Sequence, residues 1–202
     1  VELKAVERYV NYALNQPVKV TSAAKGHDGG QLVDGNLDRD NGWWSENTAT
    51  GPHRERHREY ALPQSAIVAL EKTRTVDHVS VLPYYFDRER LERYGRPRFQ
   101  QFFVETSMDG KNWKTVFDER KNIKTTFGDP LERWFEPHEA KFVKLTVTYN
   151  SMLSGARIIE MGVFGPQKEF QAIMRKPADP GKIVFPINMS EIPPEKIDYL
   201  LD

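Results

Sequence analysis

The loop around Asp34 carries the residue types best suited to binding a metal ion. Asp34-Gly35-Asn36 is followed by Asp38 and Asp40, so several short oxygen-bearing side chains lie on one glycine-containing loop. A hard cation such as Ca²⁺ takes six to eight oxygen ligands at roughly 2.3–2.6 Å, and such a loop can supply several of them. Asp and Asn also favour turns without any metal, so a metal-free Asx-rich turn is the alternative interpretation.

Two segments rich in arginine, 53–59 and 87–98, are the candidates for ligand binding. Arginine guanidinium groups bind carboxylate or sulfate groups through two parallel hydrogen bonds. Aromatic rings near both segments could stack on the apolar face of a sugar. We expect ligand contacts from Trp43, Arg58, Tyr85 and Arg90. The alternative is a self-neutralising surface network of Arg and Glu, in which each exposed pair contributes about 0–1 kcal/mol.

The sequence carries no recognisable catalytic motif. Ser45 and Ser107 lack a Gly-x-Ser-x-Gly elbow, and no His-Glu-x-x-His pair is present. The five histidines are scattered along the chain. We therefore expect no independent enzymatic activity.

Composition excludes several other classes. The 29 basic residues are balanced by 29 acidic ones, which argues against a general nucleic-acid binder. There is no cysteine, so disulfide frameworks and thiol chemistry are excluded. No apolar run reaches the ~18 residues of a membrane span. The chain starts at Val1 without a basic-then-apolar leader, and we interpret it as part of a longer protein.

Short strand-like runs separated by turn residues predict an all-β fold. Alternating runs on either side of Asp109-Gly110 indicate a hairpin, because these two residues tolerate the positive φ of a tight primed turn. Trp134 and Phe135 fit a buried strand. Without interleaved helices, the pattern favours a sandwich or closed barrel. The expected strands are Val18–Ser22, Ala66–Leu70, Val76–Pro83, Gln101–Ser107, Trp113–Phe117, Arg133–Phe135, Phe142–Tyr149 and Glu160–Phe164.

The two ends of the chain differ from the middle. Residues 1–11 are ambiguous between helix and strand, and we interpret them as an N-terminal extension. Gly165-Pro166 ends the strand pattern, and several prolines follow in residues 166–202. This last segment is expected to be a Pro-rich arm or linker, with about two helical turns at Lys168–Lys176.

Four segments in a fixed order carry a family resemblance. Leu32–Asn36 is followed by Trp43-Trp44-Ser45, then by the hairpin Ser107–Trp113, and finally by Ala156–Gly165. Together they resemble the discoidin-like domain, also called the coagulation factor 5/8 type C domain. Within it, the chain is most similar to bacterial family 32 carbohydrate-binding modules. The resemblance covers roughly residues 12–165.

This resemblance implies an eight-stranded, jelly-roll-like antiparallel β-sandwich of the galactose-binding-domain-like type, with its loops gathered at one end. It also implies one structural calcium. The Asp34 and Glu160 carboxylates and the Asn36 carbonyl would bind it, and Asp38 or Asp40 would replace the threonine usual in the family. The carbonyls of Gln31 and Ile159 would complete part of the shell. Trp44 is expected in the core, because the family packs the tryptophan at that position.

The resemblance further implies a non-catalytic carbohydrate-binding module of a larger secreted bacterial glycan-degrading protein. Its ligand would be a glycan, and the arginine-rich loops favour an acidic one. A covalently linked catalytic domain would be its partner, and its location would be extracellular, periplasmic or at the cell surface. The first alternative is a structural spacer packed on a catalytic domain without a ligand of its own. Binding to a protein or an anionic membrane ranks last, because few exposed apolar loop tips are available.

Overall fold

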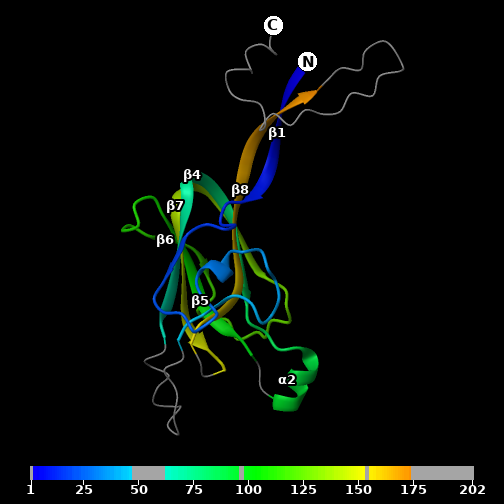
Figure 1. The fold of residues 1–202 in the computed structure, drawn as a ribbon, viewed down its shortest axis with the longest axis vertical. Coiled ribbons are helices and arrows are strands. Elements are labelled where there is room, and N and C mark those ends of the chain that lie inside the picture. Colours follow the sequence, from blue (N-terminus) through cyan, green and yellow to red (C-terminus); the bar gives the residue numbers. More distant parts are fainter. Residues whose placement is uncertain (1, 47–61, 96–97, 153–154, 174–202) are drawn as a thin grey trace, which may run out of the picture. The chain divides into compact units, whose positions relative to one another are not determined.

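The computed structural model describes residues 2–46, 62–95, 98–152 and 155–173, and an antiparallel β-sheet dominates them (Figure 1). In this part of the chain, eight strands form one hydrogen-bonded sheet in the order β1-β8-β4-β7-β5-β6, with β2 paired to β4 and β3 to β8. The all-β antiparallel fold expected from the sequence is confirmed. The strands are β1 Glu2–Asn11, β2 Val18–Val20, β3 Trp43–Trp44, β4 Gln64–Pro83, β5 Gln100–Ser107, β6 Lys114–Asp118, β7 Leu131–Asn150 and β8 Arg157–Ile173.

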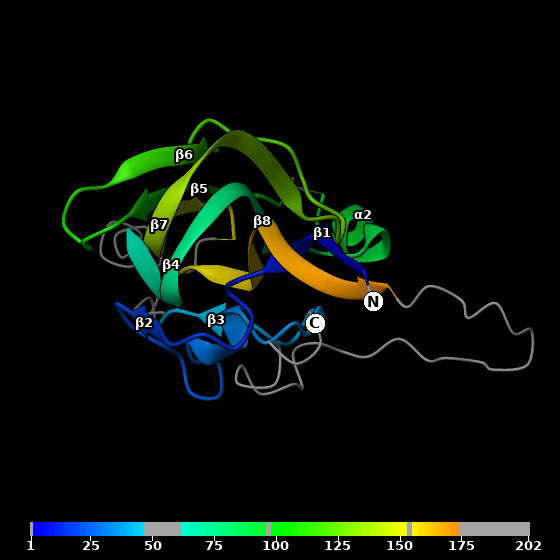
Figure 2. The same ribbon diagram turned by 90° about the horizontal axis from the view of Figure 1, so that it is seen from above.

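Two long bent strands fold this sheet into a sandwich. β4 and β7 are each 20 residues long, and their pairing shifts between Ala69 and Arg74 and again between Val76 and His78. Such irregularities bend a strand and increase its twist. The first half of β4 therefore pairs with β2 and β7, and its second half pairs with β7 and β8. Figure 2 shows both strands as arcs. The sequence predicted two short strands where each of these continuous strands lies.

Alternating side chains of the two layers form the core. Val79, Val81 and Val163 are fully buried between the layers, so their strand neighbours point to the opposite face. Phe102 of β5 and Phe117 of β6 meet edge to face with their ring centroids 5.4 Å apart. Such a pair contributes about 0.5–1.5 kcal/mol beyond the area it buries.

The hairpin between β5 and β6 is confirmed. Gly110 has a φ of 72°, which an L side chain rarely adopts. The Asp109 carboxylate accepts hydrogen bonds from the Asn112 and Lys111 amides, each 2.8 Å long, and one from the Ser107 hydroxyl. These bonds hold the pKa of Asp109 well below its ordinary value, first of all those from Asn112 and Lys111.

Two segments differ from the sequence-based expectation. β8 continues through Gly165-Pro166 to Ile173 beside β1, so the helix expected from Lys168 is wrong over the described part. Pairing with a neighbouring strand overrides the local helix preference there. Conversely, a short helix, α2, spans Arg88–Tyr94 within a segment expected to be a loop. Its Arg, Glu and Leu residues are good helix formers, and Glu89 and Arg93 pair one turn apart at 3.1 Å.

Trp134 also departs from expectation, because 58% of its surface is exposed. The start of β7 pairs with the second half of β4, and Glu132 and Trp134 are both exposed there. Trp134 lies on an outward face and not in the buried strand that its sequence pattern favours.

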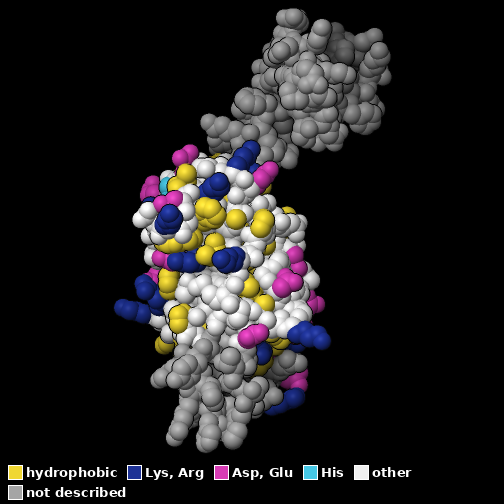
Figure 3. Space-filling view, turned by 60° about the vertical axis from the view of Figure 1, so that its left-hand side comes forward, with side chains coloured by type: hydrophobic (Ala, Val, Ile, Leu, Met, Phe, Trp, Pro, Cys, Tyr) yellow, Lys and Arg dark blue, Asp and Glu magenta, His cyan; other side chains and the backbone are white. Residues whose placement is uncertain are grey.

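Contacts group residues 11–165 into one compact unit and residues 1–10 with 166–202 into a second one. The sites described below lie in residues 11–165. In the described part of the chain, no helix is long and apolar enough to cross a bilayer. Figure 3 shows one face of the molecule, on which Lys and Arg side chains lie among Asp and Glu side chains, in keeping with the balanced charge.

Candidate functional site

One end of the sandwich, here called the loop end, gathers the connections that follow β4, β6 and β7. Backbone hydrogen bonds of 3.0 Å run there from Tyr84 to Arg157, from Ser45 to Ala156 and from Ser151 to Phe99, and the Arg98 amide donates to the Thr125 hydroxyl of the connection after β6 at 3.1 Å. The helix α2 lies at this end (Figure 1). The family resemblance placed ligand contacts at such an end.

Trp44 lies in a cluster of rings and one cation at the loop end. The His27 ring stacks on it with centroids 3.6 Å apart and 4° between the planes. The Arg157 guanidinium lies 4.5 Å from the centre of the Trp44 ring and 5.7 Å from that of Tyr84. Burial lowers the pKa of Arg157, but arginine remains a cation in proteins. The cation–π contacts therefore hold these side chains in one arrangement.

A buried amide network fixes the backbone of Arg157. The Gln100 side chain donates to the carbonyl of Arg157 and accepts from its amide at 3.0 Å. The Asn150 side chain donates to Gln100 at 3.4 Å and to the carbonyl of Gly155 at 2.8 Å. Because these groups are buried and paired, the start of β8 and the cation above Trp44 are held rigidly.

The structure corrects the expectation for Trp43. Its side chain is fully buried, and its indole N–H donates to the Ser22 carbonyl at 2.9 Å. A ring without an exposed face cannot stack on a ligand. Trp44, expected in the core, is half-buried instead. The two tryptophans are neighbours on a strand and therefore point to opposite faces.

A second group of side chains, here called the Tyr85 surface, comprises Tyr85, Arg88 and Phe127. Tyr85 is half-buried and lies against Gly128, where an added Cβ would come within 3.0 Å of its ring. The Arg88 guanidinium lies 5.7 Å from the centre of the Phe127 ring, and 49% of Phe127 is exposed. A ring and a cation from two different connections thus lie together. Arg88 belongs to the arginine-rich segment 87–98 that was expected to bind a ligand, whereas Phe127 could not be predicted, because residues 119–130 carry no recognisable motif.

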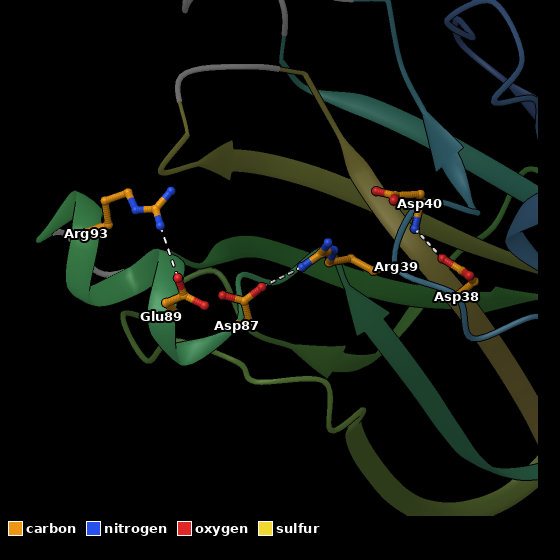
Figure 4. A network of polar contacts seen from close by, with 6 residues as sticks. All are labelled: Asp38, Arg39, Asp40, Asp87, Glu89 and Arg93. Atoms are coloured by element: carbon orange, nitrogen blue, oxygen red, sulfur yellow. Dashed lines mark hydrogen bonds and ion pairs between the residues drawn. The ribbon is translucent and has the colours of Figure 1, made fainter.

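Several charges at the loop end are already paired. Arg39 forms an ion pair with Asp87 at 2.9 Å, and Arg93 forms one with Glu89 (Figure 4). These pairs match the self-neutralising network considered as the alternative. Of the other expected ligand residues, Arg58 lies outside the described residues. Arg90 belongs to α2, but its side chain also lies outside the described part.

The expected metal loop does meet the late glutamate. The Gly35 amide donates to both carboxylate oxygens of Glu160, at 3.2 and 3.3 Å. Glu160 is 7% exposed, and burial raises the pKa of its carboxyl to about 8. The Gly35 hydrogen bond opposes this rise, whereas the negative charge of Asp34 adds to it. Two carboxylates therefore lie close together, and in the described part no Lys or Arg forms an ion pair with either.

Oxygen atoms of the same loop converge on one polar group. The Asn41 side-chain nitrogen donates to both carboxylate oxygens of Asp34 at 3.1 Å and to the Asn36 carbonyl at 3.3 Å. Gln31 donates to the Asn41 side chain at 2.9 Å. These oxygens are the donor set that a hard cation prefers, so the residues fit the calcium implied by the resemblance. A bound cation would replace the Asn41 nitrogen as their partner.

The remaining proposed ligands lie beside this loop. The Asp40 amide donates to the Asp38 carboxylate at 2.9 Å, which engages Asp38 within the turn (Figure 4). A Cβ added to Gly42 would lie 2.8 Å from the Ile159 carbonyl oxygen, so the loop passes close to this carbonyl. No three His, Cys, Asp or Glu side chains come together as a metal site among the described residues. Calcium would therefore depend on backbone carbonyls as well as on Asp34 and Glu160.

A family model described as the F5/8 type C domain matches residues 17–161. The chain belongs to this family. The matched residues of this F5/8 type C domain include both the Asp34 loop and Glu160. Among curated proteins, none matches the sequence.

Solved structures share the fold of this F5/8 type C domain. A chitosan-binding module of a chitosanase/glucanase from Paenibacillus sp. IK-5, in complex with chitotriose, is 24% identical with a TM-score of 0.56, covering 77% of this chain and 100% of its own. A Clostridium perfringens module in complex with GlcNAc-α-1,4-galactose is 22% identical with a TM-score of 0.57, covering 78% and 95%. The family 32 carbohydrate-binding module of C. perfringens NanJ, in complex with galactose, is 17% identical with a TM-score of 0.56, covering 79% and 100%.

Proposed function

We propose that this chain is a non-catalytic carbohydrate-binding module that binds a glycan at its loop end. The observation that carries the proposal is the Tyr85 surface, where an aromatic ring and a cation from two connections lie together on a rigid sandwich. Membership of the F5/8 type C family supports it. The similar modules described above, with chitotriose, GlcNAc-α-1,4-galactose or galactose bound, support it as well.

An acidic sugar is the ligand class that the Tyr85 surface fits best. Phe127 offers an exposed ring face, and Arg88 beside it offers a guanidinium group that can bind a carboxylate or sulfate through two hydrogen bonds. Arg39 and Arg93 are engaged in ion pairs, so Arg88 is the better candidate cation. An open site with few rings buries little area, and we expect affinity on the order of micromolar to millimolar.

Calcium would have a structural role in this module. The carboxylates of Asp34 and Glu160, with Asp40, and the carbonyls of Gln31, Asn36 and Ile159 would hold it. It would supply the positive charge that the buried Glu160 carboxylate lacks and would tie the early loop to β8. It would take no part in a reaction.

The parent protein would be a secreted bacterial enzyme that degrades glycans, with its catalytic domain covalently linked to this module. The module would then hold the enzyme near its substrate outside the cytoplasm, in the periplasm or at the cell surface. The family membership and the origin of similar modules in a chitosanase/glucanase support this part of the proposal.

A glycan microarray with the whole chain, in calcium-containing buffer, tests the proposed function. Binding to uronic-acid or sulfated glycans that is lost in Arg88→Ala and in Tyr85→Ala is the expected result. Lys111→Ala, on the β5–β6 hairpin away from the loop end, is the matched control and should bind as the wild type does. If no glycan class binds, the proposed function is wrong and the structural spacer becomes the better interpretation.

A further inference from the structure

A row of three aromatic rings crosses the outer face of β4, β7 and β8. His78 of β4 pairs with Trp134 of β7 and with Phe164 of β8. The Trp134 and His78 rings are stacked, with centroids 4.1 Å apart and 3° between their planes, and Phe164 lies 4.9 Å from His78 at 25°. Because Trp134 is 58% exposed, this row presents an indole ring to solvent in a fixed orientation.

A groove of about 310 Å³ lies on the same outer face. Ser80 and Leu82 of β4, Gly162 and Phe164 of β8, and Glu132 of β7 are among the residues that line it. Gly162 keeps the groove open, because an added Cβ would come within 2.4 Å of the Phe164 ring and 2.8 Å of the Ser80 hydroxyl. The volume of the groove lies at the lower end of the roughly 300–1,000 Å³ that is typical of small-ligand sites.

A buried ring nitrogen beside this groove lacks a partner. His78 is 7% exposed, and its Nε2 has no hydrogen-bond partner in the described part of the chain. The nearest acidic oxygen, Oε1 of Glu132, is 3.9 Å away, which is too far for a direct hydrogen bond. Burial lowers the pKa of His78, against the opposing charges of Glu132 and Asp77, so the ring is a neutral donor and acceptor.

The charge of this face favours a cationic ligand. The residues that line the groove include the exposed carboxylate of Glu132 but neither Lys nor Arg. Arg133, the next residue along β7, lies over the core ring of Phe117 at 5.4 Å and so belongs to the opposite face. A ligand ammonium near Trp134 would gain a cation–π contact in addition to an ion pair with Glu132.

We propose that this face is a second carbohydrate site that binds a sugar unit with a free amino group. The apolar face of the sugar stacks on Trp134, and its ammonium pairs with Glu132. The site has the opposite charge preference to the Tyr85 surface, although Gly128, which lies against Tyr85, also lines the groove. Gly35 and Glu160 of the candidate metal site line another part of the same groove, and the ring row lies at Phe164, four residues from Glu160 along β8, or roughly 13 Å.

Isothermal titration calorimetry of the whole chain with a glucosamine trimer and an N-acetylglucosamine trimer tests this site. N-acetylation removes the positive charge, so the wild type should bind the glucosamine trimer more tightly. Trp134→Ala should weaken binding of this trimer at least about tenfold, since exposed stacking rings are typical hot spots. Glu132→Gln should abolish the preference for the free amine. Glu139→Gln, on the same strand but away from the groove, should bind as the wild type does.

Nuclear magnetic resonance of the wild type gives a readout that needs no variant. The glucosamine trimer should shift the indole N–H signal of Trp134 and the ring signals of His78.

Trp134→Phe, which keeps a stacked ring, should retain part of the affinity and control for loss of packing. The proposal is overturned if the wild type does not bind the glucosamine trimer, or if Trp134→Ala and Glu132→Gln bind it unchanged. Arg88→Ala should leave this binding intact, which separates this test from that of the loop end.

Discussion

The amide of Gly35 donates hydrogen bonds to both carboxylate oxygens of Glu160, although the two residues are 125 positions apart in the chain. This contact ties the early loop to β8. It also leaves a nearly buried carboxylate beside the charge of Asp34. The stability of the domain should therefore depend on what neutralises Glu160, whether a proton or a cation.

Calcium should stabilise the folded chain. A ligand that binds only the folded state adds about 2.7 kcal/mol to the free energy of unfolding when its free concentration is 100 times its Kd. For a chain of this size that corresponds to about 5–10 °C in Tm. Differential scanning calorimetry with calcium and with a chelator measures the difference. Glu160→Gln should remove most of it, and an unchanged Tm in the wild type would rule out the site.

Without calcium, stability should fall as pH rises from about 5 to 8. The pKa of Glu160 is raised to about 8 in the folded state from an ordinary value of 4.5. In this window the folded state keeps a proton that the unfolded state has lost, so increasing pH favours unfolding. Urea unfolding in chelator should show this slope, and Glu160→Gln should flatten it. Saturating calcium should also flatten it, because the metal holds the carboxylate ionised. An equal slope in wild type and variant would contradict the assignment to Glu160.

Gly42→Ala should destabilise the fold strongly. Gly42 has a φ of 102°, and an added Cβ would lie 2.3 Å from the Ile158 carbonyl oxygen and 2.5 Å from the Ile159 Cα. Both atoms belong to the backbone of β8, so relief requires the loop to move away. We expect a loss of about 3 kcal/mol or more. Gly26→Ala is the matched control, because Gly26 also has a positive φ, 82°, but no atom within 4 Å of an added Cβ. It should lose only about 1 kcal/mol in the same urea titration.

Binding of an acidic glycan at the loop end should weaken with salt. Contacts between exposed charges are screened as the Debye length falls from about 10 Å at 0.1 M to 3 Å at 1 M salt. Titration calorimetry at increasing NaCl concentration should show affinity falling for the wild type. Arg58→Ala, Arg88→Ala and Arg90→Ala should each reduce both the affinity and its salt dependence. A neutral sugar bound equally well at all salt concentrations, and by all three variants, would exclude the acidic ligand.

The Asp109 hairpin turn should lose its stabilising contribution in acid. Because the pKa of Asp109 is lowered in the folded state, its contribution is present above the unfolded pKa and is lost as pH falls through the folded one. Asp109→Ala should therefore lower Tm at pH 7 and have a smaller effect at pH 2. Asp129→Ala, at another exposed aspartate, should change Tm little at either pH. A constant deficit for Asp109→Ala across this range would contradict the linkage.

Strand alternation explains which site residues could be predicted and which could not. The pairing of the Asp34 loop with Glu160 was expected through the family resemblance, and the structure brings the two together. Trp43, expected at the ligand, is fully buried, and Trp44, expected in the core, is half-buried, because adjacent strand residues face opposite sides. The prediction that Trp134 is buried was wrong for a similar reason, since the composition of a strand does not show which face of β7 is covered.

Local sequence determined the turns, the strand runs and the oxygen-rich loop, because each depends on the backbone preferences and donor types of consecutive residues. Only the tertiary structure decided how those runs join, since the bends that make β4 and β7 continuous arise from pairing between distant strands. It also decided that Arg88 meets Phe127 and that His78 lies between Trp134 and Phe164. These contacts depend on which strands are neighbours and in what register, which no run of adjacent residues encodes.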